Sequence, residues 1–371
     1  MKLELLQENL TAALNQLHRI IPNKPQLSIL SSILLEAKNN SISLSATDLY
    51  VGIKTKVAGK VIKPASIAIP GRIFHNSIAT LDPGKLELSL KGDTLTITSA
   101  NNTITIACLA ADEFPEFPQL DGKAISLEAD SLERIQNMVG FSASVDPTRP
   151  VLTALLLQFD QEGLLVVGTD GFRLATLKLS ALKNKEGEQT QILIPAKAMN
   201  EAARIAVVQD TVKIGLRIAE ELKQAEIEID NTRLYVRLID GEYPPFNKII
   251  PAQFTTEIEL DGKEFESQLK RAQVFARESS NIIRLQIRDG EMRIISASPA
   301  FGRQEGVMGV EVIRGKDGEI AFNSRYLLDF ISAHKPEKIS FYMNESLSPA
   351  MFRPTQQQDY KYIVMPFRVN E

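Results

Sequence analysis

The sequence predicts an α+β protein made of three similar domains, each with two helices packed on antiparallel β-sheet. Three landmarks recur in the same order: a strand that ends in a small turn, a strand that leads into a helix, and a proline beside an aromatic residue. The first reads LSATD, VVGTD and IISASP, the second IPGRIFHNSI, IPAKAMNEAA and FNSRYLLDFI, and the third EFPEF, EYPPF and VMPFR. Such repetition indicates one structural unit used three times. Copies of roughly 124 residues have an ordinary domain size. They place the domains at residues 1–122, 123–252 and 253–371.

Each copy opens with an amphipathic helix, predicted over residues 8–21, 130–143 and 263–278. Apolar residues recur there at the spacing of one helix face, which is expected to pack on the sheet. The three faces consist of Leu10, Leu14 and Leu17, then Leu132, Ile135 and Val139, then Phe265, Leu269 and Ala272. A second, shorter helix is predicted at each IP or FN junction.

A β-hairpin follows the first helix in every copy. Strands of alternating apolar and polar residues flank Asn39–Asn40 in the first copy and Asp289–Gly290 in the third. Such residue pairs favour tight hairpin turns. Further alternating strands, such as KLELSLKGDTLTITS, come after the second helix. The order of elements therefore supports antiparallel sheet in each copy.

The composition is that of a globular protein, with 44% hydrophobic and 24% charged residues. No apolar run approaches the roughly 18 residues that a membrane helix needs. The start, MKLELLQENL, lacks the basic and then apolar pattern of a signal peptide. The single cysteine, Cys108, allows no intramolecular disulfide and indicates a reducing compartment. We expect a cytoplasmic protein in which Cys108 is a small buried hydrophobe.

The sequence has none of the common catalytic or metal-binding motifs. His18, His75 and His334 have no partner at metal-ligand spacing, and the chain has no CxxC, phosphate-binding loop or nucleophile elbow. Asp48 and Asp170 follow equivalent strands in separate copies, so they are not expected to form a carboxylate pair. We interpret them as turn residues that accept hydrogen bonds from nearby backbone N–H groups. The sequence thus predicts no catalysis, no metal and no cofactor; a hydrolase that uses Asp170 and Arg173 is the opposing hypothesis.

Basic residues lie on or beside the predicted helices, although the net charge is −4. If the helices face a common space, these residues give it a positive lining, which neutralises phosphates without reading bases. If each helix simply faces water, they are ordinary solvated charges. The residues are Arg19, Lys24 and Arg72 in the first copy, Arg134, Arg149, Lys197 and Arg204 in the second, and Lys270, Arg271 and Arg325 in the third.

Three α+β copies, VGTDGFRLATLKL in the second copy and YIVMPFRV near the end together resemble the bacterial DNA sliding clamps, the beta subunits of DNA polymerase III. The similarity extends over nearly the whole chain, through ADEFPEFPQLDG and LIDGEYPPFNKIIP. It implies a non-catalytic processivity factor: a head-to-tail homodimer that forms a closed ring, encircles duplex DNA independently of sequence and slides along it.

The resemblance also implies a cleft between the central and C-terminal domains, where short peptide motifs of partners dock. The implied partners are the replicative polymerase alpha subunit, the clamp loader, translesion polymerases and mismatch-repair proteins. Phe172 and Lys248 stand where many relatives have histidine and arginine. Carried over residue by residue, the cleft consists of Leu152, Thr169, Gly171, Phe172, Arg173, Leu174, Pro244, Lys248, Ile249, Leu347, Pro349, Ile363, Val364, Met365, Pro366, Phe367 and Arg368.

For the ring joint, the family pairs an edge strand of the first domain with the first helix region of the third. This implies that Ile104 and Ile106 of one protomer meet Val274 and Phe275 of its partner. Packing inside the third copy is the alternative for Val274 and Phe275. A second hypothesis for the whole protein is a monomeric peptide-binding adaptor that keeps the cleft but does not encircle DNA.

Overall fold

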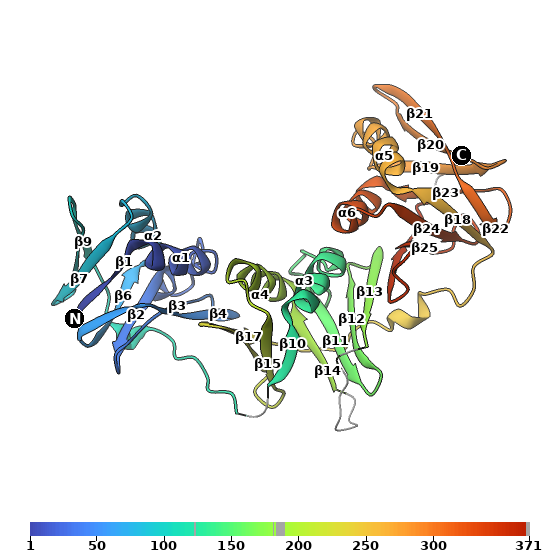
Figure 1. The fold of residues 1–371 in the computed structure, drawn as a ribbon. Coiled ribbons are helices and arrows are strands. Elements are labelled where there is room, and N and C mark those ends of the chain that lie inside the picture. The colour runs from blue at the N-terminus through green and yellow to red at the C-terminus, as the bar shows by residue number, and fades with distance from the viewer. Residues whose placement is uncertain (122–123, 181, 183–189, 369–371) are drawn as a thin grey trace. The chain divides into compact units, whose positions relative to one another are not determined.

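The computed structural model describes residues 1–121, 124–180, 182 and 190–368. The chain forms two compact units, described separately below (Figure 1). The first unit comprises Met1–Asp130 and Glu201–Leu238, and the second comprises Ser131–Asn200 and Ile239–Glu371. The central third of the sequence therefore contributes to both units. The predicted boundary at 122/123 lies outside the described residues, and the one at 252/253 stays a prediction.

The six predicted helices are present, two in each copy. The apolar positions that predicted the first helix are fully buried: Leu10, Leu14 and Leu17 have no exposed surface. This helix ends at Leu17, earlier than the sequence suggested, because a turn follows immediately. The helices are α1 (Gln7–Leu17), α2 (Gly71–Ala79), α3 (Ala129–Met138), α4 (Ala196–Val208), α5 (Gly262–Ala276) and α6 (Ser324–His334).

The first unit contains two antiparallel sheets. Helix α1 contacts α2 and packs on β3 and β4, so that the apolar side chains of helix and strands share one core. The five-stranded sheet has the order β5 (Gly59–Lys63), β1 (Lys2–Leu6), β7 (Lys85–Lys91), β8 (Thr94–Thr98) and β9 (Thr103–Ala107). The eight-stranded sheet has the order β10 (Ile125–Glu128), β15 (Lys213–Ala219), β16 (Gln224–Ile229), β17 (Thr232–Arg237), β4 (Val51–Val57), β3 (Ser41–Thr47), β2 (Ser32–Lys38) and β6 (Ala65–Pro70).

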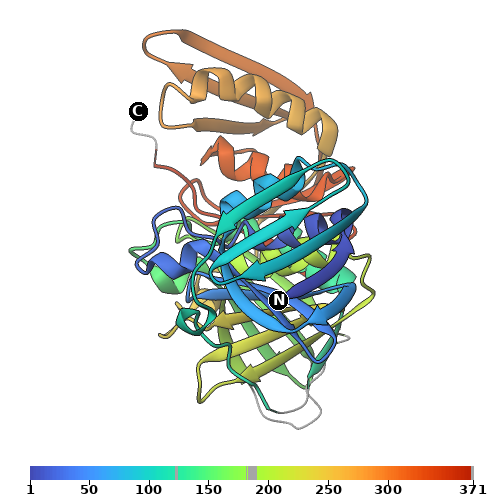
Figure 2. The same cartoon turned by 90° about the vertical axis from the view of Figure 1, so that its left-hand side faces the viewer.

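The second unit also contains two antiparallel sheets. Helix α5 lies along the β20–β21 hairpin and contacts α6, as Figure 2 shows for the hairpin. The nine-stranded sheet has the order β14 (Thr190–Pro195), β11 (Ala154–Asp160), β12 (Gly163–Thr169), β13 (Arg173–Leu179), β26 (Tyr360–Val364), β25 (Ala350–Pro354), β24 (Lys338–Met343), β18 (Thr256–Asp261) and β22 (Glu311–Arg314). The four-stranded sheet has the order β21 (Gly302–Gly309), β20 (Glu291–Ser298), β19 (Ile282–Arg288) and β23 (Gly318–Asn323).

The predicted hairpin turns are confirmed. Asn39 and Asn40 have φ values of 49° and 58°, and Asp289 and Gly290 have φ values of 49° and 79°. Two successive positive φ angles match the right-handed twist of the flanking strands, which is why Asn, Asp and Gly are favoured there.

Strands from different copies pair in the same way at two places. Strand β4 pairs with β17, placing Val51 opposite Val236. Strand β13 pairs with β26, placing Arg173 opposite Val364. Each of the two larger sheets is therefore continuous from one copy of the sequence to the next. This continuity explains why the compact units do not follow the copies.

Candidate peptide cleft and basic surfaces

The turn between β12 and β13 is closed by the side chains of Thr169 and Asp170. The Thr169 hydroxyl donates to the carbonyl oxygen of Arg173 at 2.6 Å and accepts from the Gly171 N–H at 3.0 Å. One carboxylate oxygen of Asp170 accepts from the N–H groups of Phe172 and Arg173, at 2.9 and 3.0 Å. The interpretation of Asp170 as a turn residue is therefore confirmed. Gly171, at φ 92°, occupies a backbone conformation that suits glycine.

The Arg173 guanidinium is almost fully engaged within the second unit. Its Nε donates to Asp170 Oδ2 at 3.0 Å, and its Nη1 donates to Asp329 Oδ2 at 2.6 Å. Its Nη2 donates to the Phe141 carbonyl oxygen at 2.9 Å. Burial disfavours the charge, but Tyr362, Asp329 and Asp170 together raise the pKa of Arg173 above its ordinary value. Arg173 thus fixes the turn, and little of its side chain remains for a ligand.

Three residues beside Arg173 were not predicted from the sequence. The guanidinium lies 4.7 Å from the Tyr326 ring centroid and 5.5 Å from the Phe141 ring centroid, within cation–π range. Asp329, which follows Tyr326 on α6, forms the ion pair with Arg173. These residues are far from Arg173 in sequence. The sequence signals were the helix predicted over 130–143, which contains Phe141, and the FNSRYLLDFI junction, which contains Tyr326 and Asp329; neither indicates which residue is its neighbour.

The last strand brings the terminal segment to the same turn. The pairing of β13 with β26 places Leu174 opposite Ile363, and the pairing of β25 with β26 places Ala350 opposite Val364. Beyond the strand, the Met365 N–H donates to the Phe172 carbonyl oxygen at 2.9 Å. Residues from two distant parts of the sequence, the turn after β12 and the terminal segment 350–365, therefore meet at one edge of the turn.

The predicted cleft residues divide into a buried base and an exposed rim. Leu174 and Ile363 belong to a buried apolar cluster together with Phe246, whose 3₁₀ turn (Phe246–Lys248) carries Lys248. Phe172 is 55% exposed and Met365 is 38% exposed. Thr169 and Val364 are also buried; Leu152, Arg173, Pro244, Pro349 and Pro366 are half-buried; and Gly171, Lys248, Ile249, Leu347, Phe367 and Arg368 are exposed. An apolar base with exposed apolar side chains at its rim suits an extended peptide.

A hollow of about 680 Å³ adjoins this region. It is lined by β11, β14 and the loop 240–248, and it includes the predicted cleft residues Pro244 and Lys248. Leu156 and Leu193, from the same apolar cluster, form its base. The hollow extends the rim of the predicted cleft along the sheet.

The first copy keeps the same turn without the same side chains. Asp48 accepts from the N–H groups of Tyr50 and Val51, at 2.9 and 2.7 Å, as Asp170 does in the second copy. Leu49 stands at the position of Gly171, with φ 73°, and Val51 stands at the position of Arg173. Backbone geometry is therefore repeated, whereas the glycine and the arginine are specific to the second copy.

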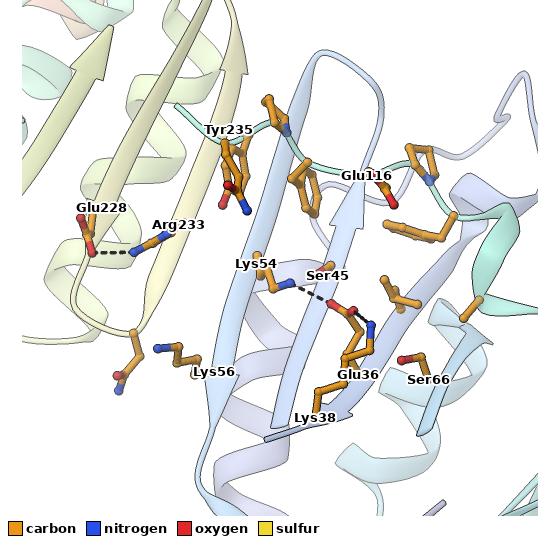
Figure 3. Close-up of a pocket in the computed structure, with 18 of the residues that line it drawn as sticks. Glu36, Lys38, Ser45, Lys54, Lys56, Ser66, Glu116, Glu228, Arg233 and Tyr235 are labelled. Carbon is orange, nitrogen blue, oxygen red and sulfur yellow. Dashed lines mark hydrogen bonds and ion pairs between the residues drawn. The ribbon is translucent and has the colours of Figure 1, made fainter. Parts of the chain in front are cut away.

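A second hollow, of about 770 Å³, lies in the first unit between the eight-stranded sheet and the segment 111–119 (Figure 3). Glu36 pairs there with Lys54 at 2.8 Å and with Lys38 at 3.1 Å, and Arg233 pairs with Glu228 at 3.2 Å. Acidic and basic side chains thus neutralise each other across the base of this hollow.

The predicted DNA-facing residues vary in how free their charges are. Arg19 and Arg204 both pair with Glu201, at 3.1 and 2.9 Å. Arg134 pairs with Asp359 and Lys270 with Glu266, each at 2.6 Å. Arg72 bonds to Asn23, and Arg149 lies 3.5 Å from Asp146. Lys24, Arg271 and Arg325 are exposed, and so are Arg19, Arg72, Arg149, Lys197 and Lys270. Their contact with DNA stays a prediction.

The predicted ring-joint residues differ in exposure. Val274 is 65% exposed on α5, and Phe275 and Ile104 are half-buried. Ile106 is only 5% exposed, because it points into the core beneath β9. Strand β9 is nevertheless the edge of its sheet, so its backbone is available for pairing.

Three further features concern Cys108, clusters of possible metal ligands, and helices long enough to span a membrane. Cys108 is a free, buried thiol whose pKa is raised by burial, as expected of a small buried hydrophobe. Within the described ranges, no cluster of three or more His, Cys, Asp or Glu side chains is arranged to hold a metal ion. Within the same ranges, no helix is both long enough and apolar enough to cross a membrane.

Comparison with known proteins finds, along the whole chain, the same family that the sequence resembles. The models of the N-terminal, central and C-terminal domains of the DNA polymerase III beta subunit match residues 1–118, 126–245 and 247–368. A beta sliding clamp of Synechocystis is 29% identical over 391 residues, with 100% of each chain covered. The beta sliding clamp of Bacillus subtilis is 26% identical, with 99% of this chain and all of the relative covered. The crystal structure of the DNA polymerase III beta subunit from Thermotoga maritima is 28% identical over the whole of both chains, with a TM-score of 0.92.

Proposed function

This chain belongs to the DNA polymerase III beta subunit family, the sliding clamps, and from this premise we propose that two copies close into a ring that holds a polymerase on duplex DNA. The observation that carries the proposal is the coverage. All three domains of the family are matched in order, and full-length clamps align over the whole chain. The role is non-catalytic processivity in DNA replication.

The ring accounts for tight retention without tight contacts. A closed ring leaves DNA only by opening or by reaching an end, so each phosphate contact can be weak. Exposed cations such as Arg271, Arg325 and Lys24 suit this role, because phosphate contacts position a protein on the duplex but carry no sequence information. Arg19 and Arg204 share a single carboxylate, that of Glu201, so these three side chains keep a net positive charge that can attract phosphates.

Catalysis by Asp170 and Arg173 is the weaker hypothesis on geometric grounds. Both oxygens of Asp170 are engaged, one by two backbone N–H groups and the other by Arg173. A general base or nucleophile needs a lone pair within reach of substrate. We therefore assign both residues to the support of the peptide cleft.

The cleft would receive short segments of the polymerase, and also of the clamp loader, translesion polymerases and mismatch-repair proteins. This proposal is supported by the exposed apolar side chains of Phe172, Met365 and Leu347. They lie beside the buried cluster that contains Leu174 and Ile363. Met365 has an adaptable thioether that can fit several partner sequences. Lys248 adds a positive charge at the rim, which suits an acidic residue flanking the docked motif.

The ring requires a head-to-tail homodimer. We place Ile104 and Ile106 of one protomer against Val274 and Phe275 of its partner, with the backbone of edge strand β9 contributing. Val274 supports this choice, because an apolar side chain that is 65% exposed on an amphipathic helix buries little of its surface within its own unit.

Light scattering on the full chain tests the proposal. One chain has a mass of 41.1 kDa, and the ring requires a species of twice that mass at micromolar concentration. Val274→Asp should shift the mass toward the monomer. A monomer at all concentrations would contradict the ring and favour a peptide-binding adaptor that does not encircle DNA.

A further inference from the structure

The hollow beside the predicted cleft, lined by β11, β14 and the loop 240–248, has a floor of two cross-strand pairs. The pairing of β11 with β14 places Leu156 opposite Leu193. Further along the same strands, Gln158 lies opposite Gln191, whose side-chain N–H donates to Gln158 Oε1 at 3.3 Å. Residues two apart on a strand share one face, so the leucine pair and the amide pair are neighbours. The floor is therefore uncharged, apolar at one end and polar at the other.

The loop 240–248 forms a wall of the hollow and is held in place along its length. Where the loop begins, the Ile239 N–H donates to the Leu193 carbonyl oxygen at 2.8 Å. In its middle, the Tyr243 hydroxyl donates to the Val167 carbonyl oxygen at 3.4 Å. Near its end, Phe246 is buried in the same apolar cluster as Leu193. The hollow is therefore formed before a ligand binds, which lowers the entropic cost of filling it.

Two charged side chains on the rim of the hollow are available to a partner. Glu242 and Lys248 are exposed, and among the residues that the structure describes neither side chain has an ion-pair partner. Asp240, which is already engaged, adds a second carboxylate to the lining. Lys248 belongs to the predicted cleft, whereas the two carboxylates lie outside it. The rim is thus basic where the hollow meets the cleft and acidic elsewhere.

The equivalent hollow of the first unit differs in its floor. Strand β2 pairs with β6 there, and counting the same distance along each strand from the position opposite the landmark proline places Glu36 at the position of Gln158. Glu36 pairs with Lys54 at 2.8 Å and with Lys38 at 3.1 Å (Figure 3). The floor of that hollow therefore has charges that are already paired. The floor beside the cleft has no charge, and its free charges lie on the rim, within reach of a bound segment.

The hollow is continuous with the predicted cleft. Pro244 and Lys248 belong to both, and the buried cluster beneath the cleft supplies the leucine pair of the floor. A segment docked in the cleft therefore enters the hollow if it extends past its motif at that end. An apolar side chain is stabilised there by covering the leucine pair. A basic side chain is stabilised by the carboxylate of Glu242, because opposite charges across an interface select the partner.

We propose that this hollow is a flanking subsite of the peptide cleft, which receives the residues next to a docked motif and selects an apolar residue beside a lysine or arginine. The proposal rests on the proposed function, since it needs a peptide in the cleft. Partners that share one motif therefore differ in affinity according to the residues that flank it. An apolar and basic flank binds most tightly, and an acidic flank binds least tightly.

Fluorescence anisotropy with the full-length protein tests the flanking subsite. The probe is a labelled peptide that carries the clamp-binding motif of the replicative polymerase. Further peptides add Gly-Leu-Lys or Gly-Leu-Glu to it, reading outward from the motif, at the N-terminal end or at the C-terminal end. Each affinity is divided by that of the unextended peptide on the same protein, so that effects on the cleft itself cancel.

The test variant is Glu242→Lys, and the matched control is Glu291→Lys. Glu291 is exposed in the same unit and does not line the hollow. Wild type and Glu291→Lys should bind the lysine extension about fivefold more tightly than the glutamate extension, at one end of the peptide only. Glu242→Lys should reverse this order. The preference should shrink as salt is added, because exposed ion pairs are screened.

Methyl NMR of the protein locates the extension. The methyl signals of Leu156 and Leu193 should shift with the lysine extension but not with the unextended peptide. Those of Leu174 and Ile363, which belong to the predicted cleft, should shift with both. Shifts confined to the cleft signals with every peptide would place the extension outside the hollow and contradict the subsite.

Equal affinities of wild type for the two extensions, with normal binding of the unextended peptide, would overturn the flanking subsite and leave the cleft intact. A lysine preference that persists in Glu242→Lys would overturn it as well. If the unextended peptide fails to bind wild type, the cleft itself is contradicted, and the subsite with it.

Discussion

At the scale of single residues, Met365 gives the sharpest test of the peptide cleft. Its backbone N–H is held by the Phe172 carbonyl oxygen at 2.9 Å, so truncation of its side chain should leave the chain path unchanged. We expect Met365→Ala to weaken binding of a polymerase-derived peptide by about 2 kcal/mol, roughly thirtyfold in Kd, since anchoring side chains dominate such interfaces. Fluorescence anisotropy measures the change.

Val145→Ala is the control for this experiment. Val145 lies in the same unit and is 97% exposed, so its truncation removes apolar surface that is not among the predicted cleft residues. DNA binding should be unchanged in both variants. Equal peptide affinities in Met365→Ala and Val145→Ala would contradict the assignment of the cleft.

His334 predicts a pH dependence of stability. Burial among Phe330, Tyr360 and Phe141 lowers its pKa to about 4, although a hydrogen bond with Gln357 opposes the shift. The unfolded chain, with an ordinary histidine pKa near 6.5, therefore binds more protons between pH 4 and 6.5. Stability is full above that window and is lost as the pH falls through it, by up to about 1.4 kcal/mol per pH unit.

Urea unfolding of wild type and His334→Gln from pH 4.5 to 8 measures this effect. Carboxylates also titrate at the acidic end, and they do so in both proteins, so the difference between the two curves isolates His334. The difference should be flat above pH 7 and change steadily below it. Parallel curves over the whole range would show that His334 does not carry the effect.

At this scale the sequence predicted what depends on neighbours along the chain. Asp170 was identified as a turn residue because Asx turns use residues two and three positions on. The surroundings of Arg173 were not predictable, because Phe141, Tyr326 and Asp329 come from elements far away in sequence. The same limit applies to His18, at the end of α1, and His75, on α2, whose rings stack because the two helices lie together.

At the scale of elements, the segment 111–119 depends on one glycine of β4. A Cβ on Gly52 would lie 2.1 Å from Phe117, whose ring stacks on Tyr235 with centroids 4.6 Å apart. We expect Gly52→Ala to displace Phe117 and to reduce the free energy of unfolding by about 1–3 kcal/mol, as overpacking does elsewhere. Thermal or urea unfolding measures the loss.

Gly309→Ala is the matched control, because a Cβ there meets no atom within 4 Å and the backbone angle is ordinary. It should change stability little. An unaltered unfolding midpoint in Gly52→Ala would show that the segment 111–119 does not pack on β4 as described.

Helices and hairpins were predicted from local patterns, and the structure confirms them. The pairing of β4 with β17 and of β13 with β26 was not predictable. Alternation along a strand indicates which face is buried but does not specify which strand will be its partner. Ile106 illustrates the difference: its strand lies at an edge as the resemblance implied, yet the side chain faces inward.

At the scale of the whole molecule, the repeat and the VGTDGFRLATLKL and YIVMPFRV words were enough to identify the family, and the comparisons confirm it. Net charge was a poor guide, because −4 conceals where the cations lie. The two hollows show how one design diverges between copies. The hollow lined by segment 111–119 has charges that neutralise each other, and the hollow lined by the loop 240–248 adjoins the predicted cleft. The copies share one scaffold, and a few substituted side chains distinguish the copy in which the cleft is predicted.

Retention on DNA of different topology tests the central claim most directly. The full-length protein is loaded on nicked circular DNA with its clamp loader, separated from free protein, and held in moderate salt. A ring should remain on the circle and leave within the dead time once a restriction enzyme makes the DNA linear. Salt-resistant binding that needs a circle cannot come from surface contacts, because phosphate contacts weaken with salt on either form. Equal loss from circular and linear DNA would contradict encirclement.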